Sequence, residues 1–240
     1  MLLINFMRII ILFTILGIST FSFSEEIQIN KDKLNDLIKD YILENPEILL
    51  KSIENYRKNV EKENERKIES KLFEHYEKKV FDALPYIGNK KSSLLLVEFI
   101  DYNCGYCKKT IKTVNKLVNN IDNLKIAFID FPILSDTSLL AAKAALAAES
   151  QDSYFAYHSK LLEYKGPINE EFLISVAEIL KLDIKIFKED MISERVENEI
   201  KKNLEIARSL NIRGTPTFLF KDYILAGAYE YEKLESLIKN

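Results

Sequence analysis

A Cys-X-X-Cys pair between a strand-like run and a helix-like segment places the strongest constraint on the fold. The run Leu94–Ile100 (LLLVEFI) has the length and composition of a buried strand. Apolar residues at helical spacing follow across 111–121, and 124–133 (LKIAFIDFPI) has the pattern of a second buried strand. We therefore predict a βαβ unit in an α/β core, with Cys104 and Cys107 at the turn from strand to helix.

Cys104 and Cys107 are the only cysteines among the 240 residues. A disulfide between such close neighbours closes a loop too small to stabilise a fold much, so a purely structural bridge explains the pair poorly. Backbone N–H groups and the helix dipole favour a thiolate at a helix start, and we place Cys104 in the first helical turn. We predict a redox-active disulfide in which Cys104 is the nucleophile and Cys107 resolves the mixed disulfide.

Metal binding is the main alternative use of the two thiols. A tetrahedral zinc site needs two further ligands, and only His75 and His158 could supply imidazole. Neither histidine forms a compact motif with the cysteines, so we predict no metal site and assign His158 to packing or to a helix surface. Copper(I) is satisfied by two thiolates, which leaves a copper-binding use of the pair open.

The first 24 residues differ from the rest of the chain. The whole sequence is 47% hydrophobic and 30% charged with a net charge of −3, which is typical of a globular protein and predicts no nucleic-acid binding. Residues 1–24 contain one charged side chain, Arg8, and an apolar run that is short for a membrane span. Ser22 and Ser24 fit the −3 and −1 positions of a cleavage site, so we predict a cleaved signal peptide and a periplasmic protein. A retained membrane anchor is the alternative.

Residues 25–87 are predicted to form a separate helical segment. From Lys31 to Val80 there is no glycine, Pro46 is expected to start a new helix, and apolar residues such as Leu49 recur at helical spacing. A thin segment cannot bury this stripe alone, which favours a homo-oligomer, either a trimer or a dimer. Packing against the main domain is the alternative. Proline, glycine and asparagine near residue 88 mark the boundary to that domain.

The domain 88–240 combines the βαβ unit with further helices and strands. Residues 137–210 are helical in pattern and are predicted as an insertion, in which Asn169 caps a helix. After the insertion, RGTPT predicts a turn, and two short strands joined at Lys221 and Asp222 precede a terminal helix.

Three segments of this domain resemble the DsbA-like thiol oxidoreductases of the thioredoxin superfamily. VEFIDYNCGYCKK resembles the family's active-site segment, GTPTF its cis-proline loop, and FPIL with the alanine-rich helix after it the start of its helical insertion. Upstream, YILENPEILLKSIENY is similar to the N-terminal segment of ScsC-like and Com-type members, some of which trimerise through it. The resemblance implies a thioredoxin-like α/β fold with a helical insertion, preceded by an N-terminal α-helical segment, and no cofactor.

The resemblance also implies roles for single residues. Pro216 is expected to be cis, and Thr215 to present its backbone to a substrate strand beside Cys104; a trans proline at a strand's first residue is the alternative. Glu98 matches the buried acid that relays protons to and from the resolving thiol, and a carboxyl in an apolar strand has the raised pKa that suits this role. A glutamate on an edge strand facing water is the alternative.

Gly105 and Tyr106, between the cysteines, complete the implied substrate-binding surface, and they replace the Pro-His of the family's strong oxidants. No histidine there stabilises the Cys104 thiolate, and Thr215 resembles isomerase-type members. We predict an exported thiol–disulfide oxidoreductase with isomerase or reductase character. Its partners would be unfolded or misdisulfided secreted proteins and a membrane redox partner that resets the pair. The alternatives are a DsbA-type disulfide donor and a non-enzymatic copper-binding or chaperone protein.

Overall fold

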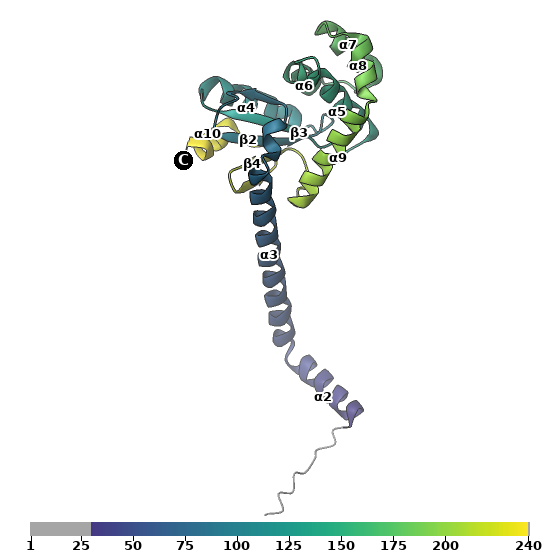
Figure 1. Cartoon of the computed structure of the whole chain (residues 1–240). Helices are drawn as coiled ribbons and strands as arrows, with labels where there is room; N and C mark the ends of the chain where they lie inside the picture. The colour runs from purple at the N-terminus through teal and green to yellow at the C-terminus, as the bar shows by residue number, and fades with distance from the viewer. Residues whose placement is uncertain (1–29, 240) are drawn as a thin grey trace, which may run out of the picture. The chain divides into compact units, whose positions relative to one another are not determined.

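The computed structural model describes residues 30–239, and the segment predicted as a signal peptide lies outside them. The chain divides into two compact units, one up to Asn59 and one from Val60 onward, which are described separately. Figure 1 shows the elements in chain order. Among the described residues, no helix combines the length and the apolar character that crossing a membrane requires.

The N-terminal unit is helical. Helix α2 (Lys31–Glu44) begins after Asn30, whose side chain accepts a hydrogen bond from the N–H of Asp32. Helix α3 (Pro46–Glu77) starts at a proline, whose missing N–H and fixed φ suit a first turn, so the prediction that Pro46 begins a new helix is confirmed. None of the apolar side chains described in this unit is buried.

The second unit is built on a five-stranded sheet of the described residues, in the order β1-β3-β2-β4-β5. The strands are β1 (Tyr86–Gly88), β2 (Leu95–Ile100), β3 (Lys125–Asp130), β4 (Thr217–Phe220) and β5 (Tyr223–Ala226). Central strand β2 is parallel to β3, to which helix α4 (Cys107–Asn120) connects it, and antiparallel to β4. The predicted βαβ unit is therefore confirmed.

Side chains alternate along the strands and form one core on each face of the sheet. On β2, Leu96 and Ile100 pack with residues of α4, whereas Val97 and Phe99 pack on the opposite face. Glu98 follows Leu96 by two positions and lies on the same face of the strand, so its carboxyl points toward α4. The strand thus directs one acid at the helix that begins in the Cys-X-X-Cys motif.

Between β3 and β4 the described chain forms five helices. They are α5 (Asp136–Glu149), α6 (Tyr154–Glu163), α7 (Glu170–Ile179), α8 (Ile184–Met191) and α9 (Glu194–Ser209). Asn169 caps α7 by accepting a hydrogen bond from the N–H of Phe172 at 2.8 Å, as predicted. Helix α10 (Tyr231–Lys239) ends the domain and contacts α4 (Figure 1).

The residues just before 88 contribute to the core of the second unit. Leu72, Phe81 and Leu84 are buried with Val97 on the sheet face opposite α4. Strand β1 pairs with β3 alone and forms one edge of the sheet. The domain boundary at residue 88 stays a prediction.

Candidate active site

Asp101 holds the loop between β2 and α4. Buried Asp101 accepts hydrogen bonds at Oδ1 from the N–H of Asn103 (2.8 Å) and at Oδ2 from the N–H groups of Ile133 and Leu134 (2.9 and 3.0 Å). Its carbonyl oxygen accepts from the N–H of Cys104 at 3.0 Å. The loop that carries Cys104 is thereby tied to the loop after β3.

Cys104 lies three residues before α4, so its predicted place in the first helical turn is wrong. The helix begins at Cys107 because a turn through Gly105 and Tyr106 intervenes. The Cys104 carbonyl oxygen accepts a hydrogen bond from the N–H of Lys108 at 3.1 Å, which aligns the loop with the helix. The N–H groups of Tyr106 and Cys107 still act on the Cys104 sulfur.

The Cys104 thiol is acidic. A hydrogen bond from the Cys107 thiol is the main cause that lowers the Cys104 pKa, and Thr215 and the backbone N–H groups of Cys107 and Tyr106 lower it further. Burial acts in the opposite direction, but the net effect lowers the pKa to about 5. At neutral pH Cys104 is therefore a thiolate, which is the form that attacks disulfides.

Cys107 has the opposite character. Its exposed fraction is 0%, against 7% for Cys104. Burial, the hydrogen bond to Cys104 and the negative charge of Glu98 all raise the pKa of Cys107. At neutral pH the site therefore holds one thiolate near the surface and one thiol behind it.

Strand β4 brings a cis-proline loop to Cys104. In the thiol form, Cys104 Sγ donates to the carbonyl oxygen of Thr215 at 3.1 Å. The Thr215–Pro216 peptide bond is cis, as the resemblance implies. Thr215 is half-buried and Pro216 is buried.

Glu98 is fully buried in the central strand, which excludes the alternative of a water-facing edge position. The Thr110 hydroxyl oxygen lies 2.6 Å from Glu98 Oε1 and 2.8 Å from the Cys107 carbonyl oxygen, and its single proton serves one of them at a time. Among the described residues, Glu98 Oε2 has no hydrogen-bond partner. Burial raises the pKa of Glu98 to about 8, although the hydrogen bond from Thr110 lowers it.

A buried polar cluster that the sequence did not reveal lies next to the cysteine loop. The Tyr102 hydroxyl is 3.1 Å from His158 Nδ1, and the Tyr154 hydroxyl donates to Asp130 Oδ2 at 3.1 Å. Burial lowers the pKa of His158 to about 3 and raises that of Asp130 to about 7. His158 is thus a neutral packing residue beside Tyr102, two positions before Cys104.

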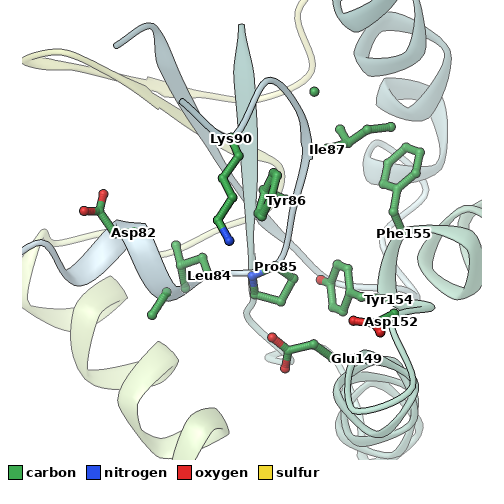
Figure 2. Close-up of a pocket in the computed structure, with 12 residues that line it drawn as sticks. Asp82, Leu84, Pro85, Tyr86, Ile87, Lys90, Glu149, Asp152, Tyr154 and Phe155 are labelled. Atoms are coloured by element: carbon green, nitrogen blue, oxygen red, sulfur yellow. The ribbon is translucent and has the colours of Figure 1, made fainter. Parts of the chain in front are cut away.

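A cavity of about 580 Å³ has neither cysteine in its lining. Figure 2 shows Tyr86 and Lys90 on one side of it and Glu149, Asp152 and Tyr154 on the other. Its lining mixes both charges, which selects no single class of ligand.

Neither histidine joins the two cysteines. His75 Nε2 lies 2.8 Å from Ser209 Oγ, and His158 belongs to the buried cluster. Across residues 30–239, no three His, Cys, Asp or Glu side chains are grouped to hold a metal ion.

Two family models match the chain. One, described as thioredoxin, matches residues 82–240, and one described as the copper resistance protein ScsC N-terminal domain matches residues 30–63. The chain belongs to the thioredoxin family. The two matches follow one another along the sequence, so this thioredoxin-family protein carries its ScsC-type segment ahead of the sheet domain.

Solved structures place this thioredoxin-family protein near DsbA-like and ScsC members. The thiol-disulfide exchange protein alpha-DsbA2 from Wolbachia pipientis is 29% identical with a TM-score of 0.68, over 73% of this chain and 96% of that one. A Proteus mirabilis ScsC variant is 26% identical with a TM-score of 0.67, over 87% and 92%. The fold class predicted from the sequence is confirmed.

Curated relatives of this thioredoxin-family protein include longer proteins. Disulfide bond formation protein D of Bacillus subtilis is 25% identical over 167 residues, which are 65% of this chain and 75% of that protein. The Na(+)/H(+) antiporter NhaA 1 of Salinispora arenicola is 28% identical over 153 residues, which are 63% of this chain. The chain spans only 24% of the length of that antiporter.

Proposed function

We propose that this protein exchanges disulfide bonds with other proteins through Cys104 and Cys107. One observation carries the proposal: hydrogen bonds lower the pKa of Cys104 to about 5, while burial raises that of Cys107. Such a pair contains an attacking thiolate and a protected resolving thiol. The likeness to a thiol-disulfide exchange protein and to disulfide bond formation protein D supports the proposal.

Reduction of a client disulfide by the cysteine pair proceeds in two steps. The Cys104 thiolate attacks one sulfur of a client disulfide, forms a mixed disulfide and releases the other client sulfur as a thiolate, which takes up a proton. Cys107 then loses its proton and attacks Cys104 Sγ, which releases the second client thiol and leaves a Cys104–Cys107 disulfide. Two electrons pass from the pair to the client. Disulfide donation is the reverse of these two steps. In isomerisation a second client thiolate attacks the client sulfur of the mixed disulfide, which forms a new client disulfide and releases Cys104 as the thiolate, with no net transfer of electrons.

Glu98 is assigned to exchange the Cys107 proton. Burial raises its pKa to about 8, so the carboxyl gains and loses protons near neutral pH. Its negative charge raises the pKa of Cys107, which supports this assignment. Thr110 lies within hydrogen-bond distance of both Glu98 and the Cys107 backbone and orients the carboxyl.

The client segment is assigned to the surface between Thr215 and the Gly105–Tyr106 turn. The Thr215 carbonyl lies against Cys104 Sγ, so an extended chain that meets Cys104 runs beside Thr215 and Pro216. Gly105 is exposed, and a Cβ added to it would meet no atom within 4 Å. Free space for a client side chain therefore lies beside the Gly105–Tyr106 turn.

For the direction of disulfide exchange, we propose that the protein acts as an isomerase or a reductase. Gly105 and Tyr106 supply no imidazole to the Cys104 thiolate, and both histidines of the chain have partners elsewhere. A disulfide donor is the second candidate, which the lowered pKa of Cys104 favours, since a stabilised thiolate makes the reduced pair more stable.

Exchange of this kind fits an oxidising compartment outside the cytosol. The pattern of residues 1–24 supports export to the periplasm, where secreted proteins acquire disulfides. The clients would be secreted proteins that are unfolded or that contain wrongly paired disulfides. A membrane redox partner would return Cys104 and Cys107 to their starting redox state after each net transfer of electrons.

Oligomerisation through α2 and α3 completes the proposal. The apolar residues Leu49, Ile53, Tyr56 and Val60 lie on one face of α3, and all four are exposed. The match of residues 30–63 to the ScsC N-terminal domain supports a shared role for this segment. A trimer or dimer would cover the apolar stripe and present several cysteine pairs to one client.

The resting redox state of the cysteines in cells tests the direction of exchange. Acid-quenched cells are treated with a thiol-reactive mass tag, with the Cys104→Ser variant as a marker of single tagging. Doubly tagged protein supports the isomerase or reductase direction, and untagged protein supports disulfide donation. Stoichiometric copper(I) binding without exchange on a disulfide peptide would instead favour the copper-binding alternative.

A further inference from the structure

A basic surface lies on the first turns of α4, next to the cysteines. A cavity of about 390 Å³ is lined there by Lys108, Lys109 and Lys112, and by Lys165 after α6. These four lysines are termed the lysine patch. Glu163 supplies the one carboxylate of the lining, so the lining has four positive charges and one negative, a net +3, whereas the whole chain carries −3.

The three exposed lysines of the lysine patch have no carboxylate partner among the described residues. Within the described part of the chain, Lys109, Lys112 and Lys165 form no ion pair with a carboxylate, and all three are exposed. Farther along the same helix, Lys116 pairs with Glu232 at 3.4 Å. On α4, the lysines without an ion pair are therefore the ones nearest the cysteines.

The positions of these lysines on α4 do not stabilise the helix. The first turn of α4 contains no acidic residue, and lysines there face the positive end of the helix macrodipole. Lys108 and Lys112 are four positions apart, so like charges lie on one helix face and repel each other. Local helix stability gives no reason for this arrangement, whereas an acidic ligand would supply the missing negative charge.

We infer that the lysine patch binds acidic segments of client proteins, so that disulfides flanked by aspartate and glutamate are exchanged preferentially. This inference rests on the proposed exchange function, because the client must bring its disulfide to Cys104. An extended client advances about 3.3 Å per residue, so side chains a few positions from its cysteine reach the first turns of α4. Tyr106 is 63% exposed, and Lys109 Nζ lies 5.1 Å from its ring centroid, which connects the cysteine turn to the patch.

The recognition expected here is mainly a long-range electrostatic attraction. Lysine ammonium groups are flexible point charges rather than a fixed fork, so the patch selects charge rather than one bound geometry. Such attraction raises the rate of encounter and weakens when salt screens it. The preference should therefore appear in the exchange rate at low ionic strength.

The test compares three synthetic peptides with one intramolecular disulfide each, which differ only in four flanking residues: glutamate, glutamine or lysine. Stopped-flow kinetics gives the second-order rate constant for the reduced protein, divided by that for dithiothreitol to remove intrinsic differences between the peptides. At low salt we expect the glutamate peptide to react roughly 3–10-fold faster than the glutamine peptide, and the lysine peptide to react more slowly than both. At about 0.5 M NaCl these ratios should approach unity.

Two charge-reversal variants locate the effect. Lys112→Glu/Lys165→Glu should abolish or invert the preference for glutamate over glutamine. Lys188→Glu/Lys201→Glu makes the same change in net charge at exposed sites on α8 and α9 and should retain the preference.

Equal rates for the glutamate and glutamine peptides in the wild type would overturn the inference. So would an equal loss of preference in both variants, because it would show dependence on total charge rather than on the patch. Failure of the wild type to react with the glutamine peptide would instead overturn the exchange function, on which the inference rests.

Discussion

At the scale of single residues, the two cysteines differ because hydrogen bonds converge on one sulfur while burial dominates at the other. We expect iodoacetamide to alkylate Cys104 with a half-maximal rate near pH 5, since only the thiolate reacts and its pKa is lowered to about 5. Cys107 should react far more slowly at neutral pH, because burial raises its pKa. Mass spectrometry of digested protein measures both sites.

The matched variant for this experiment is Cys107→Ala. It removes the hydrogen bond that contributes most to the lowered pKa, so the alkylation profile of Cys104 should move to higher pH. A Cys104 profile in the intact pair that is already centred near an ordinary thiol pKa would contradict the assignment of Cys104 as the nucleophile.

Glu98 should reduce the stability of the reduced protein at high pH. Its folded pKa is raised from 4.5 to about 8, so the folded state favours the protonated acid, and stability is lost as pH rises from 4.5 through 8. Glu98→Gln removes this ionisation and should raise the free energy of unfolding at pH 8 by roughly 1–3 kcal/mol, with little effect at pH 4.5. Urea unfolding at the two pH values measures the difference.

The control for Glu98→Gln is Glu205→Gln, at an exposed position of α9. This variant should change the free energy of unfolding by less than about 0.5 kcal/mol at either pH. A stabilisation by Glu98→Gln that is equal at both pH values would show that ionisation of the buried carboxyl does not cause the loss of stability at high pH.

The sequence predicted the residues of the site that lie within a local pattern. The spacing of Cys104 and Cys107 and the interruption of an apolar strand by Glu98 are visible in one segment of about ten residues. The contacts of Asp101 were not predicted, because two of its partners follow β3. A short polar stretch between a buried strand and the cysteines, typical of an Asx turn, was the available signal.

At the scale of elements, α3 presents an apolar face in the N-terminal unit that the described residues leave exposed. Leu49→Asp/Tyr56→Asp places two charges on that face and should lower the mass measured by light scattering, since the charges would be buried in any helix–helix seam. The control Asn55→Asp/Lys62→Ser makes the same change in net charge on the opposite side of the helix. An unchanged mass in the first variant would remove α3 from the assembly surface.

Long elements were predicted better than short ones. The start of α3 follows from Pro46 and its first turns from apolar residues at helical spacing, and the start of α7 follows from the Asn169 cap. Strand β1 has three residues and was not predicted, since it is defined by its pairing with β3 rather than by its own pattern. The start of α4 was misplaced by one turn because the sequence does not distinguish a helical first turn from the Gly105–Tyr106 turn before it.

At the scale of the whole molecule, the Cys104 thiolate links redox state to folding stability. Its pKa is lowered from 9.0 to about 5 in the folded protein, so its stabilising effect is present above pH 9 and is lost as pH falls through 5. The oxidised protein has no Cys104 thiolate and lacks this contribution. The same difference in free energy would favour transfer of a disulfide from the pair to a client.

The reduced protein should therefore unfold at a higher temperature than the oxidised protein, by roughly 2–6 °C at neutral pH. The difference between the two melting temperatures should shrink as pH is lowered toward 5, where Cys104 becomes protonated. Glu98 is present in both forms, so its own pH dependence cancels to first order in this difference. Calorimetric melts of both redox forms over this range measure it. A difference independent of pH would mean that the thiolate does not stabilise the reduced fold, and the case for disulfide donation would lose its physical basis.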